Sequence, residues 1–162
     1  MKQLLTIVLF AALTTSCNEQ NCGEATAMDN AVTIYLQDAM GNDLFETTDY
    51  ESADFTTFYV INGEAIENNM GNLDHPKHFI MSETIPQSMM MFINDSANEQ
   101  FPETIINWND AESDTLRAQY RHVSGECGSS HSSCEKLWLN DVLVWDGTVE
   151  GQVALREVTI VK

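Results

Sequence analysis

The segment KLWLNDVLVWD at residues 136–146 gives the clearest indication of the fold. Asn140 and Asp141 lie between two apolar runs and can form a two-residue β-turn. The resulting antiparallel register pairs Leu139 with Val142, Leu137 with Val144 and Trp138 with Leu143. Both faces of this hairpin are therefore apolar, which suggests a central position in a sheet or a surface for a partner. We take Trp138 and Leu143 as the candidate partner surface.

Alternating apolar and polar residues, the pattern of half-buried strands, recur along the rest of the chain. In residues 31–37 the apolar side chains share one face, and residues 115–121 repeat the pattern. Further short apolar runs lie at residues 55–61, 78–81, 88–94, 103–108 and 155–161. Turn signals separate these runs, and no segment has the period of a helix. The sequence therefore predicts an all-β protein, an antiparallel β-sandwich of about seven to nine strands with an immunoglobulin-like or fibronectin-like arrangement.

The N-terminal segment MKQLLTIVLFAALTTSC, residues 1–17, has the pattern of a secretory signal peptide. Lys2 supplies a positive charge, and residues 4–13 form an apolar run of about ten residues, too short for a membrane span. The segment resembles the lipobox of bacterial lipoprotein signals, which ends at a cysteine that is lipidated after cleavage. Thr14 occupies the position at which that family prefers Leu. Cleavage at an ordinary small-residue site, which would leave Cys17 as a plain thiol, is the alternative.

The resemblance implies that Cys17 carries a diacylglycerol and a further acyl chain such as palmitate, which anchor the protein in the membrane. Asn18 replaces the Asp that marks inner-membrane retention in enteric bacteria, so we expect the outer membrane, on either its periplasmic or its outer side. The expected organisation is a signal peptide at residues 1–16, a flexible tether at 17–30 and the β-sandwich at 31–162. As a whole the chain resembles the small envelope lipoproteins of Gram-negative bacteria that carry a single immunoglobulin-like domain.

The formal net charge of −18 argues against nucleic acid or anionic lipid as a partner. An acidic surface keeps a protein soluble, and it can also attract divalent cations or a basic partner. Asp38, Asn42 and Asp43 offer oxygen ligands for calcium, although their spacing does not match the EF-hand loop. An ordinary turn is the competing interpretation, and we assign no metal and no cofactor to the chain.

The cysteines after the anchor lie in a compartment that permits disulfides. Cys127 and Cys134 enclose the short loop sequence GSSHSS and form the natural disulfide pair, while Cys22 is left without a partner. The competing interpretation makes Cys127, His131 and Cys134 zinc ligands with His122 as a fourth. That spacing matches no common zinc motif.

Two tripeptides match the Asp-Ser/Thr-apolar pattern of a general O-glycosylation system that some Gram-negative bacteria use on exported proteins. Ser96 follows Asp95 in an expected loop and is the better candidate. Thr115 follows Asp114 at the start of an expected strand and is the poorer one.

No segment carries a catalytic pattern in which nucleophile, base and orienting group can be identified together. We therefore expect a non-catalytic binding or accessory module for another envelope protein or a glycan. A calcium- or glycan-binding module is the first alternative. The second is a secreted, hydrolase-like enzyme, which would need a cavity that gathers His122 or His131 with an acid.

Overall fold

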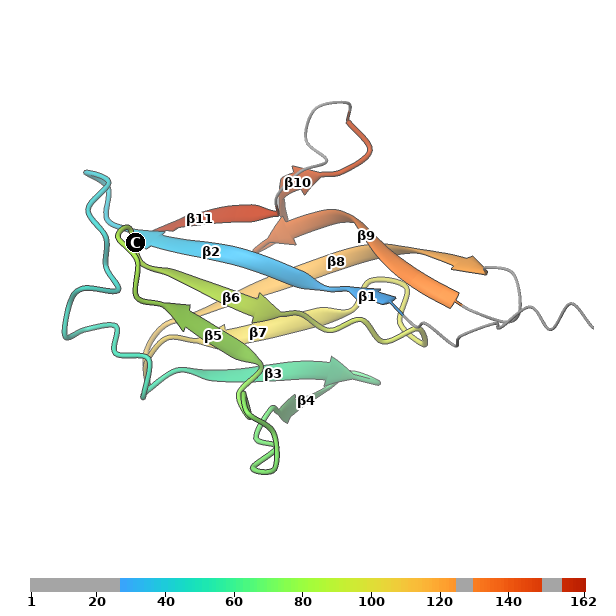
Figure 1. Ribbon diagram of the computed structural model, residues 1–162, viewed down its shortest axis with the longest axis horizontal. Coiled ribbons are helices and arrows are strands. Elements are labelled where there is room, and N and C mark those ends of the chain that lie inside the picture. Colours follow the sequence, from blue (N-terminus) through green and yellow to red (C-terminus); the bar gives the residue numbers. More distant parts are fainter. Residues whose placement is uncertain (1–26, 125–129, 150–155) are drawn as a thin grey trace, which may run out of the picture.

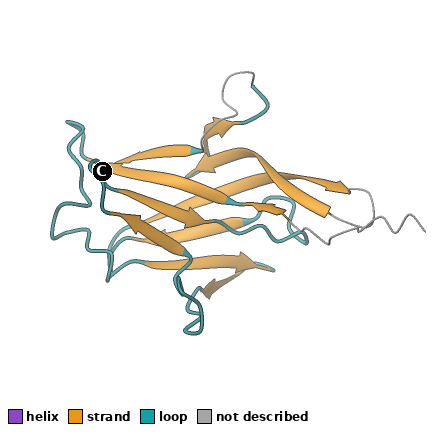
Figure 2. Ribbon diagram, in the orientation of Figure 1, coloured by secondary structure: helices purple, strands orange, loops and turns teal. Residues whose placement is uncertain are grey.

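The structure is a computed structural model that describes residues 27–124, 130–149 and 156–162. Within these ranges it contains strands and turns but no helix, so none of its described residues form a helix long and apolar enough to cross a membrane. The strands form a seven-stranded and a four-stranded sheet. The two sheets lie one over the other (Figures 1 and 2), and buried apolar residues from both form one core cluster. The prediction of an all-β sandwich is therefore confirmed.

The larger sheet has the strand order β1-β9-β8-β7-β3-β4, and β10 pairs with β9 beside this path. Most neighbouring strands in it are antiparallel, whereas β1 pairs with β9 in parallel. The bounds of these strands are β1 Ala27–Asp29, β3 Thr56–Ile61, β4 Glu64–Glu67, β7 Glu103–Asn107, β8 Ser113–Ser124, β9 Ser130–Leu139 and β10 Val142–Asp146.

The smaller sheet has the order β11-β2-β6-β5, with β11 parallel to β2. Its strands are β2 Ala31–Gln37, β5 Phe79–Ser82, β6 Ser88–Phe92 and β11 Glu157–Val161. The narrower prediction of an immunoglobulin- or fibronectin-like arrangement is not confirmed. The immunoglobulin constant type pairs a four-stranded with a three-stranded sheet, and the seven-stranded sheet here is larger than either.

Two segments differ from the sequence-based expectation. Residues 64–67, which lie outside every predicted strand, form the exposed edge strand β4, because Asn62 and Gly63 turn the chain back along β3 with positive φ angles. Residues 27–29, inside the expected tether, form β1 by pairing with β9. The predicted signal peptide at residues 1–16 and residues 17–26 of the predicted tether lie outside the described residues.

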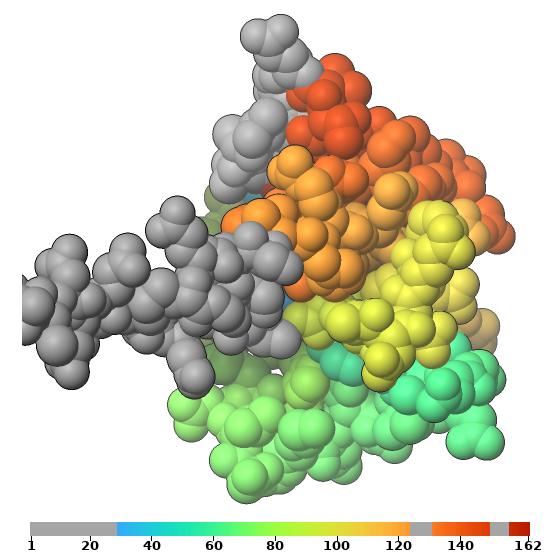
Figure 3. Space-filling view, turned by 90° about the vertical axis from the view of Figure 1, so that its right-hand side faces the viewer, coloured from blue at the N-terminus to red at the C-terminus, as the bar shows by residue number. Residues whose placement is uncertain are grey.

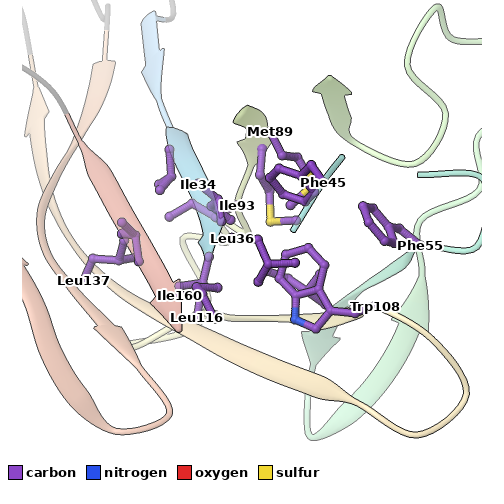
Figure 4. Packing of buried hydrophobic residues seen from close by; sticks show 14 of the residues in the cluster. Ile34, Leu36, Phe45, Phe55, Met89, Ile93, Trp108, Leu116, Leu137 and Ile160 are labelled. Carbon is purple, nitrogen blue, oxygen red and sulfur yellow. The ribbon is translucent and has the colours of Figure 1, made fainter. Parts of the chain in front are cut away.

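Alternating burial along the strands produces the core. In β2 the side chains of Val32, Ile34 and Leu36 are almost fully buried, while the residues between them are half-buried. Trp108 and Phe55, both fully buried, meet edge to face in this cluster, with ring centroids 5.2 Å apart (Figure 4).

The β9–β10 hairpin confirms the two-residue turn, since Asn140 and Asp141 both have positive φ, 47° and 67°. The expected pairs Leu139 with Val142 and Trp138 with Leu143 are present. The pairing then shifts at a bulge, so Leu137 lies opposite Trp145 and not opposite Val144. The predicted register is therefore wrong in the second half of the hairpin, because the bulge shifts the pairing.

A buried polar cluster closes one end of the core around Asp114, a residue that is 5% exposed. Its carboxylate accepts hydrogen bonds from Trp108 Nε1 at 2.6 Å and Asn140 Nδ2 at 2.7 Å. The ammonium group of Lys162 lies 2.7 Å from the same carboxylate. Burial alone would raise the pKa of Asp114, but the hydrogen bonds from Lys162, Asn140 and Trp108 outweigh it and lower the pKa. The cluster thus ties the C-terminal residue to the core.

Candidate functional site

A cavity of about 470 Å³ lies between β3, the end of β6 and the loop that leads into β5. Tyr59, Leu73 and Phe92 supply its apolar walls. Its polar lining consists of Asn30, Asp74, His75, His78 and Asp95. Figure 3 shows one end of the sandwich, where the segment after β6 (yellow) lies between the segment around residue 70 (green) and the β8–β9 pair (orange).

The local backbone of the loop places His78 at the cavity. The His78 N–H donates to the carbonyl of His75 at 3.0 Å, and the His78 carbonyl accepts the Phe92 N–H at 2.9 Å. His78 has a φ of 59°, in the left-handed region that residues with a Cβ rarely adopt. The loop is held to β3 by Thr57, whose hydroxyl donates to the Lys77 carbonyl at 2.6 Å. These bonds hold the imidazole in place between β3 and β6.

Tyr59 and His78 form a short hydrogen-bonded chain. The Tyr59 hydroxyl donates to the Phe92 carbonyl at 2.8 Å, and His78 Nδ1 lies 2.8 Å from the same hydroxyl oxygen. A phenol has a single hydrogen, and here the Phe92 carbonyl receives it, so Nδ1 must carry the proton of the second bond. This assignment leaves Nε2 of a neutral His78 as an acceptor. Burial lowers the pKa of His78 against the opposing charge of Asp95, so the neutral form prevails at pH 7.

The carboxyl groups decide the electrostatics of the cavity. Burial raises the pKa of Asp95, while its own backbone N–H and the nearby His122 and His78 oppose that shift. No Lys or Arg belongs to the described lining. Asp74 and Asp95 therefore give the cavity a negative potential beside apolar walls.

The cavity can bind a small molecule and exchange a proton at His78, but its described lining contains no Ser, Thr or Cys that could act as a nucleophile. His122 and His131, which the sequence analysis named, are not among the residues that line the cavity, although His122 is near enough to Asp95 to oppose the rise of its pKa. His122 Nδ1 lies 2.8 Å from the Ser132 hydroxyl on the exposed part of β8 and β9, and His131 is exposed on β9. Sequence reasoning missed Tyr59, His78 and Asp95 as a group because they lie on separate segments without a motif.

The two residues of the candidate partner surface differ in exposure. Leu143 is 47% exposed, and its neighbours Val142 and Val144 are 65% and 38% exposed. Trp138 is half-buried, because the guanidinium of Arg117 lies 5.3 Å from its ring and the Phe101 ring meets it edge to face at 6.0 Å. Exposed apolar side chains thus concentrate on β10, while Trp138 packs into the face of the sheet behind it.

The candidate calcium residues make an ordinary turn. Asp38 accepts the N–H groups of Met40 and Asn42 at 2.8 and 2.9 Å and the Asn42 amide at 2.6 Å. Asp43 accepts the Phe45 and Gln87 N–H groups at 3.0 and 2.7 Å. These carboxylate oxygens already have hydrogen-bond donors, and in the described part of the chain no three His, Cys, Asp or Glu residues are grouped to hold a metal.

The remaining predicted sites are only partly within the described residues. Cys17 and Cys127 lie outside them, so the lipid anchor and the disulfide stay predictions. Cys134 is buried on β9 with Sγ 3.5 Å from the Lys136 carbonyl, and as a thiol its pKa is raised by burial to about 11. Ser96 lies half-buried in a turn after β6, and Thr115 is paired with Ile105 inside the larger sheet.

No protein family, curated protein or solved structure matches this chain.

Proposed function

We propose that this protein is an envelope lipoprotein, anchored in the outer membrane through Cys17, whose β-sandwich is a non-catalytic module that docks another envelope protein. The observation that carries the docking proposal is the concentration of exposed apolar side chains on β10. Val142, Leu143 and Val144 are consecutive and all exposed. We call these three residues the β10 surface.

Two of the outer strands of the larger sheet, β4 and β10, differ in a way that supports this proposal. The strand β4 at one edge reads EAIE, and its two glutamates discourage association with a second strand. The strand β10 reads VLVWD, and among the described residues it pairs only with β9. Consecutive exposed apolar residues on an outer strand are costly in water unless a partner covers them. An extended apolar strand of another envelope protein is the occupant that fits β10, because it can add to the sheet and bury all three side chains.

The test is photo-crosslinking in cells from a reactive amino acid placed at Leu143, with the same amino acid at Ile66 as the matched control. Ile66 on β4 is 51% exposed, about as much as Leu143, but it lies on the edge strand that carries two glutamates. The proposal expects a discrete adduct from position 143 that Val142→Ser removes, and none from position 66. The absence of an adduct at 143, or the same adducts from both positions, would overturn it.

A further inference from the structure

We propose that the cavity between Tyr59, His78, Phe92 and Asp95 binds a small organic cation, an amine joined to an aromatic or aliphatic body. This site lies apart from the β10 surface and does not depend on the docking proposal. The inference uses the size of the cavity, the charge of its lining and its hydrogen-bonding groups.

The dimensions suit a small molecule. A volume of about 470 Å³ lies within the range of about 300 to 1,000 Å³ that ligand sites usually have. Tyr59, Phe92 and Leu73 form the apolar part of the lining. Ligand sites combine such walls with a few polar groups that select the orientation of the ligand.

The negative charge of the cavity lining favours a cationic ligand over an anionic one. Asp74 and Asp95 line the cavity, and neither forms an ion pair with a Lys or Arg in the described ranges. Lys77 is close in sequence, but its ammonium group donates to the Ala53 carbonyl at 2.7 Å. Placing an anion beside these carboxylates would add repulsion, whereas a cation would offset the cost of keeping Asp95 half-buried and ionised.

The hydrogen-bonding groups of the cavity favour a ligand that donates an N–H group. His78 offers Nε2 as an acceptor, because Nδ1 is committed to the Tyr59 hydroxyl. The Tyr59 hydroxyl is committed in turn to the Phe92 carbonyl. A protonated amine can donate to Nε2 and to the Asp95 carboxylate while its apolar body contacts the rings of Tyr59 and Phe92, which also attract a positive charge.

The experiment is calorimetric titration of the full chain, purified from its membranes in detergent, with three probes of similar size. The probes are phenethylamine, 2-phenylethanol and 3-phenylpropionate, which are cationic, neutral and anionic at pH 7.5. We expect measurable binding of phenethylamine alone, weakened about tenfold or more by Asp95→Asn, since a charged hydrogen bond is lost. Asp49→Asn, which removes an exposed carboxylate outside the cavity lining, is the matched control and should leave binding unchanged.

A second variant covers the case in which the loss of charge alters the fold. Leu73 is 47% exposed at the cavity wall, so Leu73→Trp should be folded and should obstruct the cavity. Loss of phenethylamine binding in this variant supports the assignment. Equal binding of the amine and the alcohol, preference for the carboxylate, no binding of any probe, or binding unaffected by both Asp95→Asn and Leu73→Trp would overturn it.

Discussion

Replacing Asp114 with Ala tests the polar cluster that closes the core. The carboxylate accepts hydrogen bonds from Trp108 Nε1 and Asn140 Nδ2 and pairs with Lys162, and the residue is only 5% exposed. Removing one partner of a buried ion pair costs about 3 to 5 kcal/mol. Since Lys162 is 18% exposed and can regain water, we expect the lower end, about 3 kcal/mol.

This loss converts into a measurable change of melting temperature. A domain of about 130 residues has an unfolding entropy of about 0.27 kcal/mol/K, so a loss of about 3 kcal/mol lowers the Tm by about 11 °C. The assay is thermal unfolding of the full chain followed by circular dichroism. Asp110→Ala, in the exposed turn before β8, is the control and should change stability by less than about 0.5 kcal/mol. A shift for Asp114→Ala no larger than that of Asp110→Ala would refute the reasoning.

The pH dependence provides an independent check on the same residue. The pKa of Asp114 is lowered in the folded state from an ordinary value of 3.8. A carboxyl whose folded pKa is lowered contributes its full stabilisation above the unfolded value and loses it as the pH falls through the folded value. The stability difference between wild type and Asp114→Ala should therefore be constant from about pH 5 to pH 8 and shrink below about pH 4. A difference that persists unchanged at pH 2 would contradict an ionised Asp114.

Three further predictions concern other parts of the molecule. Gly147→Ala should destabilise the domain by about 1 to 3 kcal/mol in denaturant unfolding, because a Cβ there would lie 2.2 Å from the Trp145 ring. Gly71→Ala, which has open space around it, is the control. Equal unfolding midpoints for the two variants would contradict the contact. The intact mass of the protein purified from its own membranes should exceed the mass of residues 17–162 by a diacylglycerol and an acyl chain, and it should rise by two protons on reduction. A bare polypeptide mass would contradict the predicted anchor, and an unchanged mass on reduction would contradict the predicted disulfide. Millimolar calcium should raise the Tm no more than sodium at equal ionic strength, since Asp38 and Asp43 already accept backbone N–H groups; a calcium-specific rise that Asp38→Asn abolishes would restore the calcium interpretation.

Some of the candidate sites follow from local pattern alone, and others do not. The exposure of Leu143 could be anticipated, because the hairpin sequence carries its own turn and register up to the bulge. The bulge itself has no local signal, so the position of Trp145 was not anticipated. The cavity could not be anticipated at all, since Tyr59, His78 and Asp95 belong to segments whose spatial order depends on how the sheets pair.

The amino-acid sequence by itself determined the strand-rich character of this protein, the face that β2 buries, and the turns at Asn62-Gly63 and Asn140-Asp141. These features depend on the two-residue period of a strand and on the φ preferences of single residues, which are local properties. Only the tertiary structure decided that β1 pairs in parallel with β9 and that β11 pairs in parallel with β2. It also decided that Lys162 forms an ion pair with Asp114 and that His78 contacts Tyr59. Such contacts join residues far apart in the chain, and they are selected by the free energy of the whole packed core, which no short stretch of sequence contains.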